Sequence, residues 1–286
     1  ISPIYFGKTY SLTYSSHTEK NESGTGVVYA VGSDLSNRNF DNLNLQNAVF
    51  DKADLSNTSF KNTDINGARF VNANLSNSNL LDRIDLSNIN LSGTDLSNVS
   101  LKEKNLSGTM LTGANLTGTI LTGADLRGTI LTGADLTGAI LIKADLTGAI
   151  LKDVDLSGKD LSDSILKDVD LSGKDLSGTN LAYSDLRLSD LSGTILSDSI
   201  LLRANLSKID LRTTKLDNAD FRYANLTESK LPDSLLVNNN FDHAALNNIN
   251  FAGKDLSGSS FQQTELDGSD MQNTNLSGAD FIQVDF

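Results

Sequence analysis

The chain has 286 residues, and its 23 lysines and arginines against 36 aspartates and glutamates give a formal net charge of −13. This balance disfavours direct binding to nucleic acid or to an anionic membrane, because both call for a basic surface. With no cysteine and two histidines, disulfides, thiol chemistry and cysteine–histidine zinc sites are excluded. No apolar run is long enough for a membrane-spanning helix, and no cofactor is expected.

Residues 1–32 do not follow the pattern of the rest of the chain. Tyr10, Leu12 and Tyr14 alternate with polar residues, and 27–29 resemble a second strand, which is typical of a short β-hairpin. We expect a small β cap here, because the open first layer of a repeat protein has to be covered. An aromatic binding patch is the other interpretation, since four of the six tyrosines lie in this segment.

In residues 33–286 an apolar residue returns every five residues. These centres begin at Leu35, shift by one residue across 81–85 and continue without a break to Phe286, and each is Leu, Phe, Ile or Met. Ala, Ser or Thr usually stands two before a centre, Asp or Asn one before it, and Gly often two after it. We predict one repeat domain with a bulge or small corner loop at 81–85.

The five-residue period predicts a coil with four sides. It fits neither a helix nor a long alternating strand, whereas a large and a small residue two apart can both face inward from one short extended side. Phe221 and Phe241 are twenty residues apart, as are Phe40 and Phe60, so like residues stack if each coil has four sides. Residues 33–286 divided into coils of twenty residues make about 13 coils, and layers spaced by about 4.8 Å then predict a rod on the order of 60 Å long.

The repeated unit resembles a known family signature. The run Ala124-Asp125-Leu126-Arg127-Gly128 and its neighbours resemble the A(D/N)LXX signature of pentapeptide repeat proteins. The resemblance extends over 33–286 and implies an all-β fold, a right-handed quadrilateral β-helix. It implies little about the role of the chain, because one fold hosts many functions.

Within 86–150 the residue before the centre alternates between acidic and aliphatic. In a coil of twenty residues the aliphatic ones form two columns on opposite sides. One column holds Met110, Ile130 and Ile150, and the other holds Ile120 and Ile140. Stacking of like side chains explains these columns, and so does a docking stripe, because contiguous exposed apolar surface often marks an interface. Both interpretations stay open, and the columns are the predicted partner site.

Acidic residues at the same repeat position form predicted ladders. Asp125 and Asp145 belong to one ladder, and Asp135, Asp155 and Asp175 belong to another. Hard cations favour carboxylate ligands, but we interpret these ladders as solvated surface and predict no metal site.

Four lysines occupy the small inward position of the repeat, namely Lys104, Lys159, Lys174 and Lys254. Two of them come from a 15-residue stretch repeated in tandem over 151–180. A lysine cannot stay unpaired in an apolar interior. We therefore expect each ammonium group to reach solvent at a corner or to pair with a neighbouring carboxylate such as Asp160 or Asp175.

The repeat keeps its register to the last residue, which predicts that Phe281 and Phe286 lie at an uncapped end. Unpaired ladder groups at such an end invite pairing with a second copy of the chain. An end-to-end homodimer is therefore one expectation, and a chain cut at this point is the other.

No catalytic constellation is visible, and the chain is not expected to be an enzyme. His17 lies in the expected cap and His243 at an outward repeat position, so neither belongs to a recognisable nucleophile–base set. The main hypothesis is a protein-binding or structural scaffold rod with an unidentified protein partner. The alternative, implied by similarity to certain pentapeptide repeat proteins, is an acidic DNA mimic that protects or inhibits a type II topoisomerase such as DNA gyrase. The chain departs from those proteins in lacking their large loops and C-terminal dimerisation helix.

Overall fold

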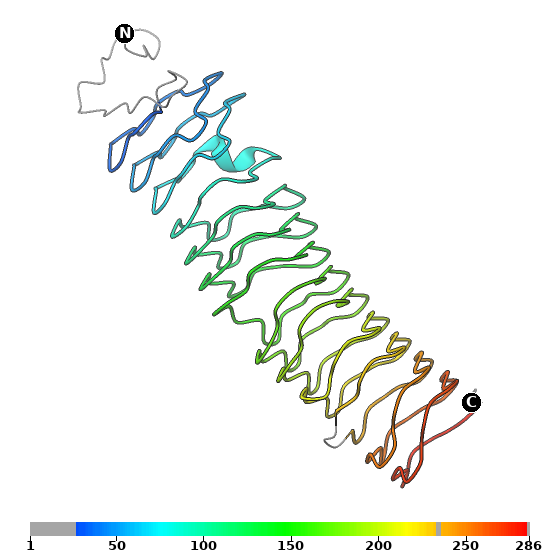
Figure 1. Cartoon of the computed structure of the whole chain (residues 1–286). Coiled ribbons are helices and arrows are strands. Elements are labelled where there is room, and N and C mark those ends of the chain that lie inside the picture. Colours follow the sequence, from blue (N-terminus) through cyan, green and yellow to red (C-terminus); the bar gives the residue numbers. More distant parts are fainter. Residues whose placement is uncertain (1–26, 233–235, 285–286) are drawn as a thin grey trace.

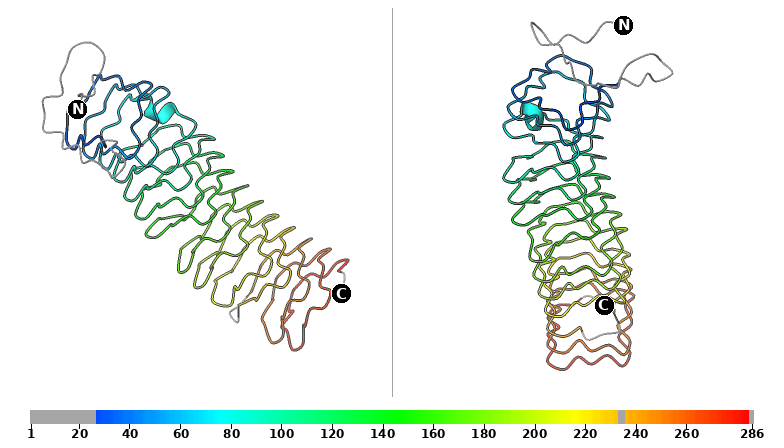
Figure 2. Two further views of the ribbon diagram at one scale, coloured as in Figure 1. Left: turned by 45° about the horizontal axis from the view of Figure 1, so that its top comes forward. Right: turned by 90° about the vertical axis from the view of Figure 1, so that its left-hand side faces the viewer.

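The computed structural model describes residues 27–232 and 236–284. The chain forms a rod of stacked coils and advances from one end of the rod to the other (Figure 1, Figure 2). The only helix among the described residues is the 3-10 helix η1, Asn79–Asp82. Within the same ranges, no helix has the length and apolar character needed to cross a membrane.

Parallel β-bridges join residues twenty positions apart in successive coils. Asp125 pairs with Asp145, and Ile130 pairs with Ile150. Beside each bridge the centre N–H donates to a carbonyl one coil later, as from Leu126 to Asp145 at 2.7 Å. Each pairing involves one residue from each coil, and no strand of more than one residue occurs in the described ranges. The expected extended sides are therefore very short, because a turn follows every apolar centre.

Each side ends in a tight turn that explains the glycine of the repeat. The N–H of Ala134 donates to the carbonyl of Leu131 at 2.8 Å, and Gly133 between them has a φ of +63°. A positive φ at the third residue is the requirement of a type II turn, and glycine meets it without steric cost. Asparagine tolerates the same conformation, which explains Asn98 at this position with a φ of 58°.

Apolar centres and small residues together fill the interior. Leu126 and Leu131 are fully buried, and so is Thr129 two residues before a centre. The Thr129 hydroxyl donates to the carbonyl of Leu106 in the preceding coil at 3.0 Å, so this buried polar group has a partner. The prediction that the large and the small residue both face inward is confirmed.

The phenylalanines stack as their spacing predicts. The rings of Phe40 and Phe60 lie 4.9 Å apart at an interplanar angle of 19°. Those of Phe241 and Phe261 lie 5.1 Å apart at 21°. Aromatic pairs of this kind add about 0.5–1.5 kcal/mol beyond the burial of their area. Both pairs are twenty residues apart in the sequence, so like side chains do stack in successive coils.

The extra residue in 81–85 is accommodated next to η1. Arg69 pairs with Asn90, one residue beyond the usual interval. Arg83 follows η1, and its Nη1 donates to two carbonyls of the preceding coil at 3.1 and 2.8 Å. The guanidinium group therefore ties this irregular corner to the coil before it.

Most of the expected N-terminal cap, residues 1–26 with His17, lies outside the described residues. Residues 27–32 already belong to the first coil. Tyr29 pairs with Val49, and the N–H of Ala30 donates to the carbonyl of Val49 at 2.8 Å. The coils therefore begin before the expected boundary at residue 33.

Candidate functional site

The aliphatic columns predicted from the sequence are aligned in the structure. Met110 pairs with Ile130, Ile130 with Ile150, and Ile120 with Ile140. The exposed fractions are 39% for Met110, 36% for Ile120, 40% for Ile140 and 49% for Ile150, and Ile130 is half-buried. We call these the Met110 column and the Ile120 column. Because residues ten apart lie on opposite sides of a four-sided coil, the two columns occupy opposite faces of the rod.

The acidic ladders are only partly formed. Asp125 and Asp145 pair as predicted. Asp135 and Asp175 pair with residues other than aspartate, and Asp155 makes no bridge to any described residue. Among the described residues no bridge joins Asp155 to Asp135 or to Asp175, so the Asp135–Asp155–Asp175 ladder stays a prediction.

The carboxylates of these ladders are held by the turn that follows each of them. The Oδ1 of Asp155 accepts the N–H of Ser157 at 2.9 Å and its hydroxyl at 2.7 Å. These bonds hold the pKa of Asp155 below its ordinary value. The hydroxyl and then the N–H of Thr137 lower the pKa of Asp135 in the same way. No group of three or more His, Cys, Asp or Glu suited to a metal ion occurs in the part of the chain described.

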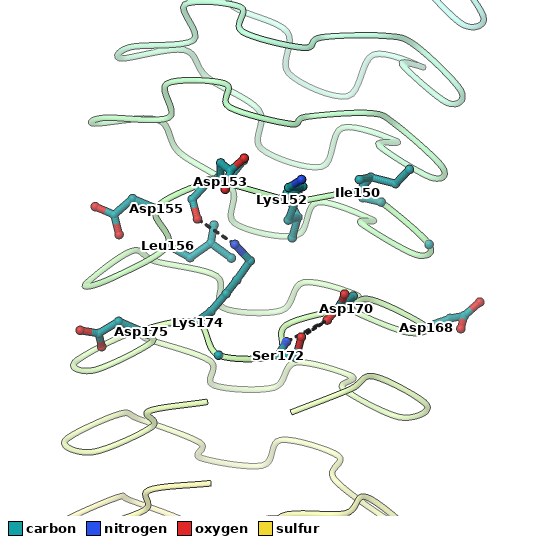
Figure 3. Close-up of a pocket in the computed structure, with 15 residues that line it drawn as sticks. Ile150, Lys152, Asp153, Asp155, Leu156, Asp168, Asp170, Ser172, Lys174 and Asp175 are labelled. Atoms are coloured by element: carbon teal, nitrogen blue, oxygen red, sulfur yellow. Dashed lines mark hydrogen bonds between the residues drawn. The ribbon is translucent and has the colours of Figure 1, made fainter. Parts of the chain in front are cut away.

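The stack opens between two coils at the tandem repeat. Ile150 and Asp170 are twenty residues apart, as are Asp155 and Asp175, yet neither described pair forms a bridge. The opening is a cleft of about 760 Å³, which we call the 150/170 cleft (Figure 3). It is lined by residues 148–156 on one side and by residues 168, 170 and 172–175 on the other.

Lys174 spans this cleft. Its Nζ reaches toward the coil on the other side (Figure 3) and donates to the carbonyl of Val154 at 3.0 Å. Burial lowers the pKa of Lys174, and the carboxylates of Asp153, Asp170 and Asp155 partly oppose that shift. The ammonium group therefore connects the two coils by a hydrogen bond, and three carboxylates lie near it.

The other inward lysines use the same kind of partner. Nζ donates to a carbonyl of the preceding coil from Lys159 to Leu136 at 3.0 Å, from Lys104 to Arg83 at 3.0 Å and from Lys254 to Pro232 at 2.8 Å. Among the described residues no ion pair joins Lys159 to Asp160 or Lys174 to Asp175. The expected pairing with those carboxylates is wrong, because the backbone carbonyl lies within reach of the ammonium group first.

One outward column was missed by reasoning from the sequence. Tyr183, Arg203, Tyr223 and His243 follow one another at intervals of twenty residues. The Arg203 guanidinium lies 5.8 Å from the Tyr183 ring centre and 4.8 Å from that of Tyr223. The rings of Tyr223 and His243 stack at 4.3 Å and 2°. All four residues occupy the turn position and adopt positive φ values between 57° and 61°. The sequence signal for this column was the recurrence, every twenty residues, of a large side chain at a position where Gly or Asn is usual.

The comparison with protein families identifies the repeat. A family model described as "Pentapeptide repeats (8 copies)" matches overlapping segments that together run from residue 31 to residue 286. The chain belongs to the pentapeptide repeat family. A search of curated proteins gives no match for this pentapeptide repeat chain.

Among solved structures, the chain is similar to other pentapeptide repeat proteins. HetL from the cyanobacterium Nostoc sp. strain PCC 7120, involved in heterocyst differentiation regulation, is 26% identical over 88% of this chain and 89% of that one, with a TM-score of 0.25. A protein from the thylakoid lumen of Arabidopsis thaliana is 26% identical over 41% and 68%, with a TM-score of 0.22. QnrB1, a plasmid-mediated fluoroquinolone resistance protein, is 15% identical over 85% and 93%, with a TM-score of 0.19.

The last described coil of this pentapeptide repeat protein continues the phenylalanine stack. Phe281 lies 4.7 Å from Phe261 at an interplanar angle of 7°, and it is half-buried. Phe286 lies outside the described residues. The end-to-end contact of two copies through these residues stays a prediction.

Proposed function

We propose that this pentapeptide repeat protein is a non-enzymatic scaffold rod that binds a protein partner along one of its aliphatic columns. The coils are taken to wind as a right-handed quadrilateral β-helix, as the family resemblance implies, and to number about 13, as the twenty-residue period predicts. The observation that carries the proposal is the exposure of Met110, Ile120, Ile140 and Ile150, at 36 to 49% each, on an acidic chain.

The energetic argument follows from the area that these side chains leave in water. Full burial of an aliphatic side chain contributes about 1.5–3 kcal/mol, so completing the burial of a half-exposed one contributes about 1 kcal/mol. Three such residues in one row offer a partner a continuous apolar line. The charged residues around the line add specificity and association rate more than affinity.

The test uses the two columns as controls for each other. The variants are Met110→Lys/Ile130→Lys on one face and Ile120→Lys/Ile140→Lys on the other. Each is used as bait, beside the unchanged chain, in a lysate of the cells that encode it, and bound proteins are compared quantitatively by mass spectrometry. Ile150 is left unchanged because it also lines the 150/170 cleft.

A partner that docks on one column is lost from one double variant and kept by the other. Circular dichroism of both variants is expected to match that of the unchanged chain, because the altered side chains point outward and lysine is tolerated at exposed positions. Equal recovery of every bound protein by all three baits would contradict the proposal.

A second candidate function is that of an acidic DNA mimic directed at a type II topoisomerase. The net charge of −13 and the turn-bound carboxylates with lowered pKa values, such as Asp135 and Asp175, favour it. Two features oppose it. The aliphatic columns interrupt the acidic surface, and arginines neutralise neighbouring aspartates in the pairs Arg127–Asp125, Arg187–Asp185, Arg212–Asp210 and Arg222–Asp220.

A supercoiling assay separates this candidate from the scaffold. DNA gyrase is assayed with increasing amounts of the chain, with and without a quinolone, at low and moderate salt. A DNA mimic inhibits or protects in a salt-sensitive manner, and Asp125→Asn/Asp145→Asn weakens that effect because it removes two adjacent charges. If micromolar protein has no effect on the gyrase reaction, the DNA-mimic function is contradicted and the scaffold function remains.

A further inference from the structure

The 150/170 cleft leaves backbone groups without partners on both of its sides. In the regular coils the centre N–H donates one coil onward, as from Leu131 to Ile150 at 2.9 Å. The equivalent bonds from Leu151 to Asp170 and from Leu156 to Asp175 are absent from the described ranges. All four of these residues line the cleft, so donors on one side are matched by acceptors on the other.

A gap in a ladder creates two strand edges that face each other. Unpaired N–H and C=O groups at an edge are a template for another extended chain. Recognition by strand addition draws its affinity from these groups and its specificity from the side chains around them. A volume of about 760 Å³ lies in the range of ordinary ligand pockets, which is enough for several residues of an extended peptide.

The charge of the lining selects the kind of peptide. The cleft presents five carboxylates against two ammonium groups, from Asp153, Asp155, Asp168, Asp170 and Asp175 against Lys152 and Lys174. Hydrogen bonds from the serine two residues on lower the pKa of Asp155, Asp170 and Asp175. The cleft therefore stays acidic at neutral pH, and a cationic occupant meets complementary charge.

We propose that the 150/170 cleft binds an extended, basic segment of a partner protein. The segment pairs along one side of the coil, with the N–H group of Leu156 in one coil and the carbonyl of Asp175 in the next. This site does not include the residues altered in the column variants. The inference therefore goes beyond the scaffold proposal, and its test can fail without contradicting that proposal.

Lys174 spans the cleft, and Lys159 makes the same kind of bond to Leu136 at the interrupted ladder one coil earlier. These two lysines give the test its key variant. Where a threonine takes the same inward position, as at Thr129, its hydroxyl reaches the preceding coil at 3.0 Å and the ladder is closed. Lys159→Thr/Lys174→Thr is therefore expected to close the stack. Lys104→Thr is the matched control, because Asn105 beside it is already bridged to both neighbouring coils.

The probe is a fluorescent eight-residue peptide of alternating lysine and valine, titrated with the full chain and followed by fluorescence anisotropy at low salt. Lys159→Thr/Lys174→Thr is expected to weaken binding by about tenfold or more, which corresponds to the loss of one or two net hydrogen bonds. Lys104→Thr and the two column variants are expected to leave it unchanged. Removing lysines makes the chain more acidic, so plain charge attraction predicts tighter binding of this cationic peptide instead.

Two further peptides test the pairing and the charge. A peptide with N-methyl groups along one edge cannot complete the ladder on that side and is expected to bind about tenfold more weakly. A peptide of alternating glutamate and valine is expected not to bind. The proposal is overturned if the unchanged chain does not bind the basic peptide, if the N-methylated peptide binds as well, or if Lys159→Thr/Lys174→Thr binds as tightly as the unchanged chain.

Discussion

The regular coils of residues 106–131 and the tandem repeat of 151–180 are built from the same five-residue unit but stack differently. In the regular coils Thr109, Thr119 and Thr129 occupy the inward position, and each hydroxyl donates to a carbonyl of the preceding coil at 2.7 to 3.0 Å. In the tandem repeat Lys159 and Lys174 occupy it, and neighbouring ladder bonds are missing. The two regions therefore differ both in the size of their inward side chains and in the continuity of the ladder.

Lys104 shows that a lysine alone does not open the stack. Asn105 beside it pairs with Asp85 in one direction and with Asp125 in the other. The Lys104 ammonium group donates to the carbonyl of Arg83, which lies in the corner that carries the extra residue. Lys254 shows the same, because the N–H of Leu236 still donates to the carbonyl of Asp255 beside it at 3.0 Å.

The largest expected effect comes from removing a buried centre. Leu126→Ala is expected to lower the free energy of unfolding by about 2–5 kcal/mol, because it leaves a cavity in a closed stack. Leu156→Ala is expected to cost about 1 kcal/mol less, because its surroundings border the cleft and relax more easily. Urea denaturation, monitored by circular dichroism, measures both losses of unfolding free energy. Equal losses would show that the closed stack and the coils beside the cleft are packed alike.

Placing a lysine in the regular coils is expected to open a second gap. Thr129→Lys is predicted to cost about 1–3 kcal/mol through overpacking and to expose the amide of Leu111, which donates to Ile130 in the native stack. Thr129→Ala is the control, since it removes one hydroxyl bond worth about 1 kcal/mol without adding volume. Unchanged exchange protection at Leu111 in Thr129→Lys would show that side-chain size does not set the spacing of the coils.

Turns are expected to respond alike in the two regions. Gly113 and Gly173 have φ values of +63° and +66°, with open space around an added Cβ. Alanine at either position is expected to cost about 1–2 kcal/mol through backbone strain alone. Asparagine is expected to cost less, since Asn98 adopts this conformation. A clearly larger loss at one site in thermal unfolding would mean that the turns differ as well as the ladder.

The smallest expected effect concerns the outward carboxylates. Hydrogen bonds from the Arg212 side chain lower the pKa of Asp210 to about 2. Because this folded-state value lies below the ordinary one, the stabilisation is present above about pH 4 and is lost as the pH falls through about 2. Asp210→Asn is expected to cost less than about 1 kcal/mol at pH 7, since the pair is solvent-exposed.

Urea midpoints of the unchanged chain and Asp210→Asn, compared at pH 7 and pH 2, check that sign. The difference between the two proteins is expected to shrink in acid. A difference that grows as the pH falls would contradict the assignment of the lowered pKa to the folded state.

Periodicity predicted the parts of the fold that repeat. The twenty-residue coil, the inward leucines and small residues and the stacking of Phe40 on Phe60 all follow from spacing, because each unit imposes the same local geometry. The carbonyl partners of Lys159 and Lys174 and the interruption of the bridges at Asp155 were not predicted. The period fixes which way a side chain points, but it does not fix which partner the polar end of that side chain reaches or whether the ladder beside it is continuous. The column from Tyr183 to His243 was missed because the turn position was read as a glycine site.

Amide hydrogen exchange in the unchanged chain tests the central claim most directly. Leu126 and Leu131 donate to the next coil, whereas Leu151 and Leu156 have no backbone acceptor among the described residues. The amides of Leu151 and Leu156 are therefore expected to exchange at least about a hundredfold faster than those of Leu126 and Leu131. Equal protection of all four amides would show that the stack is closed at the tandem repeat and that the 150/170 cleft does not exist in solution.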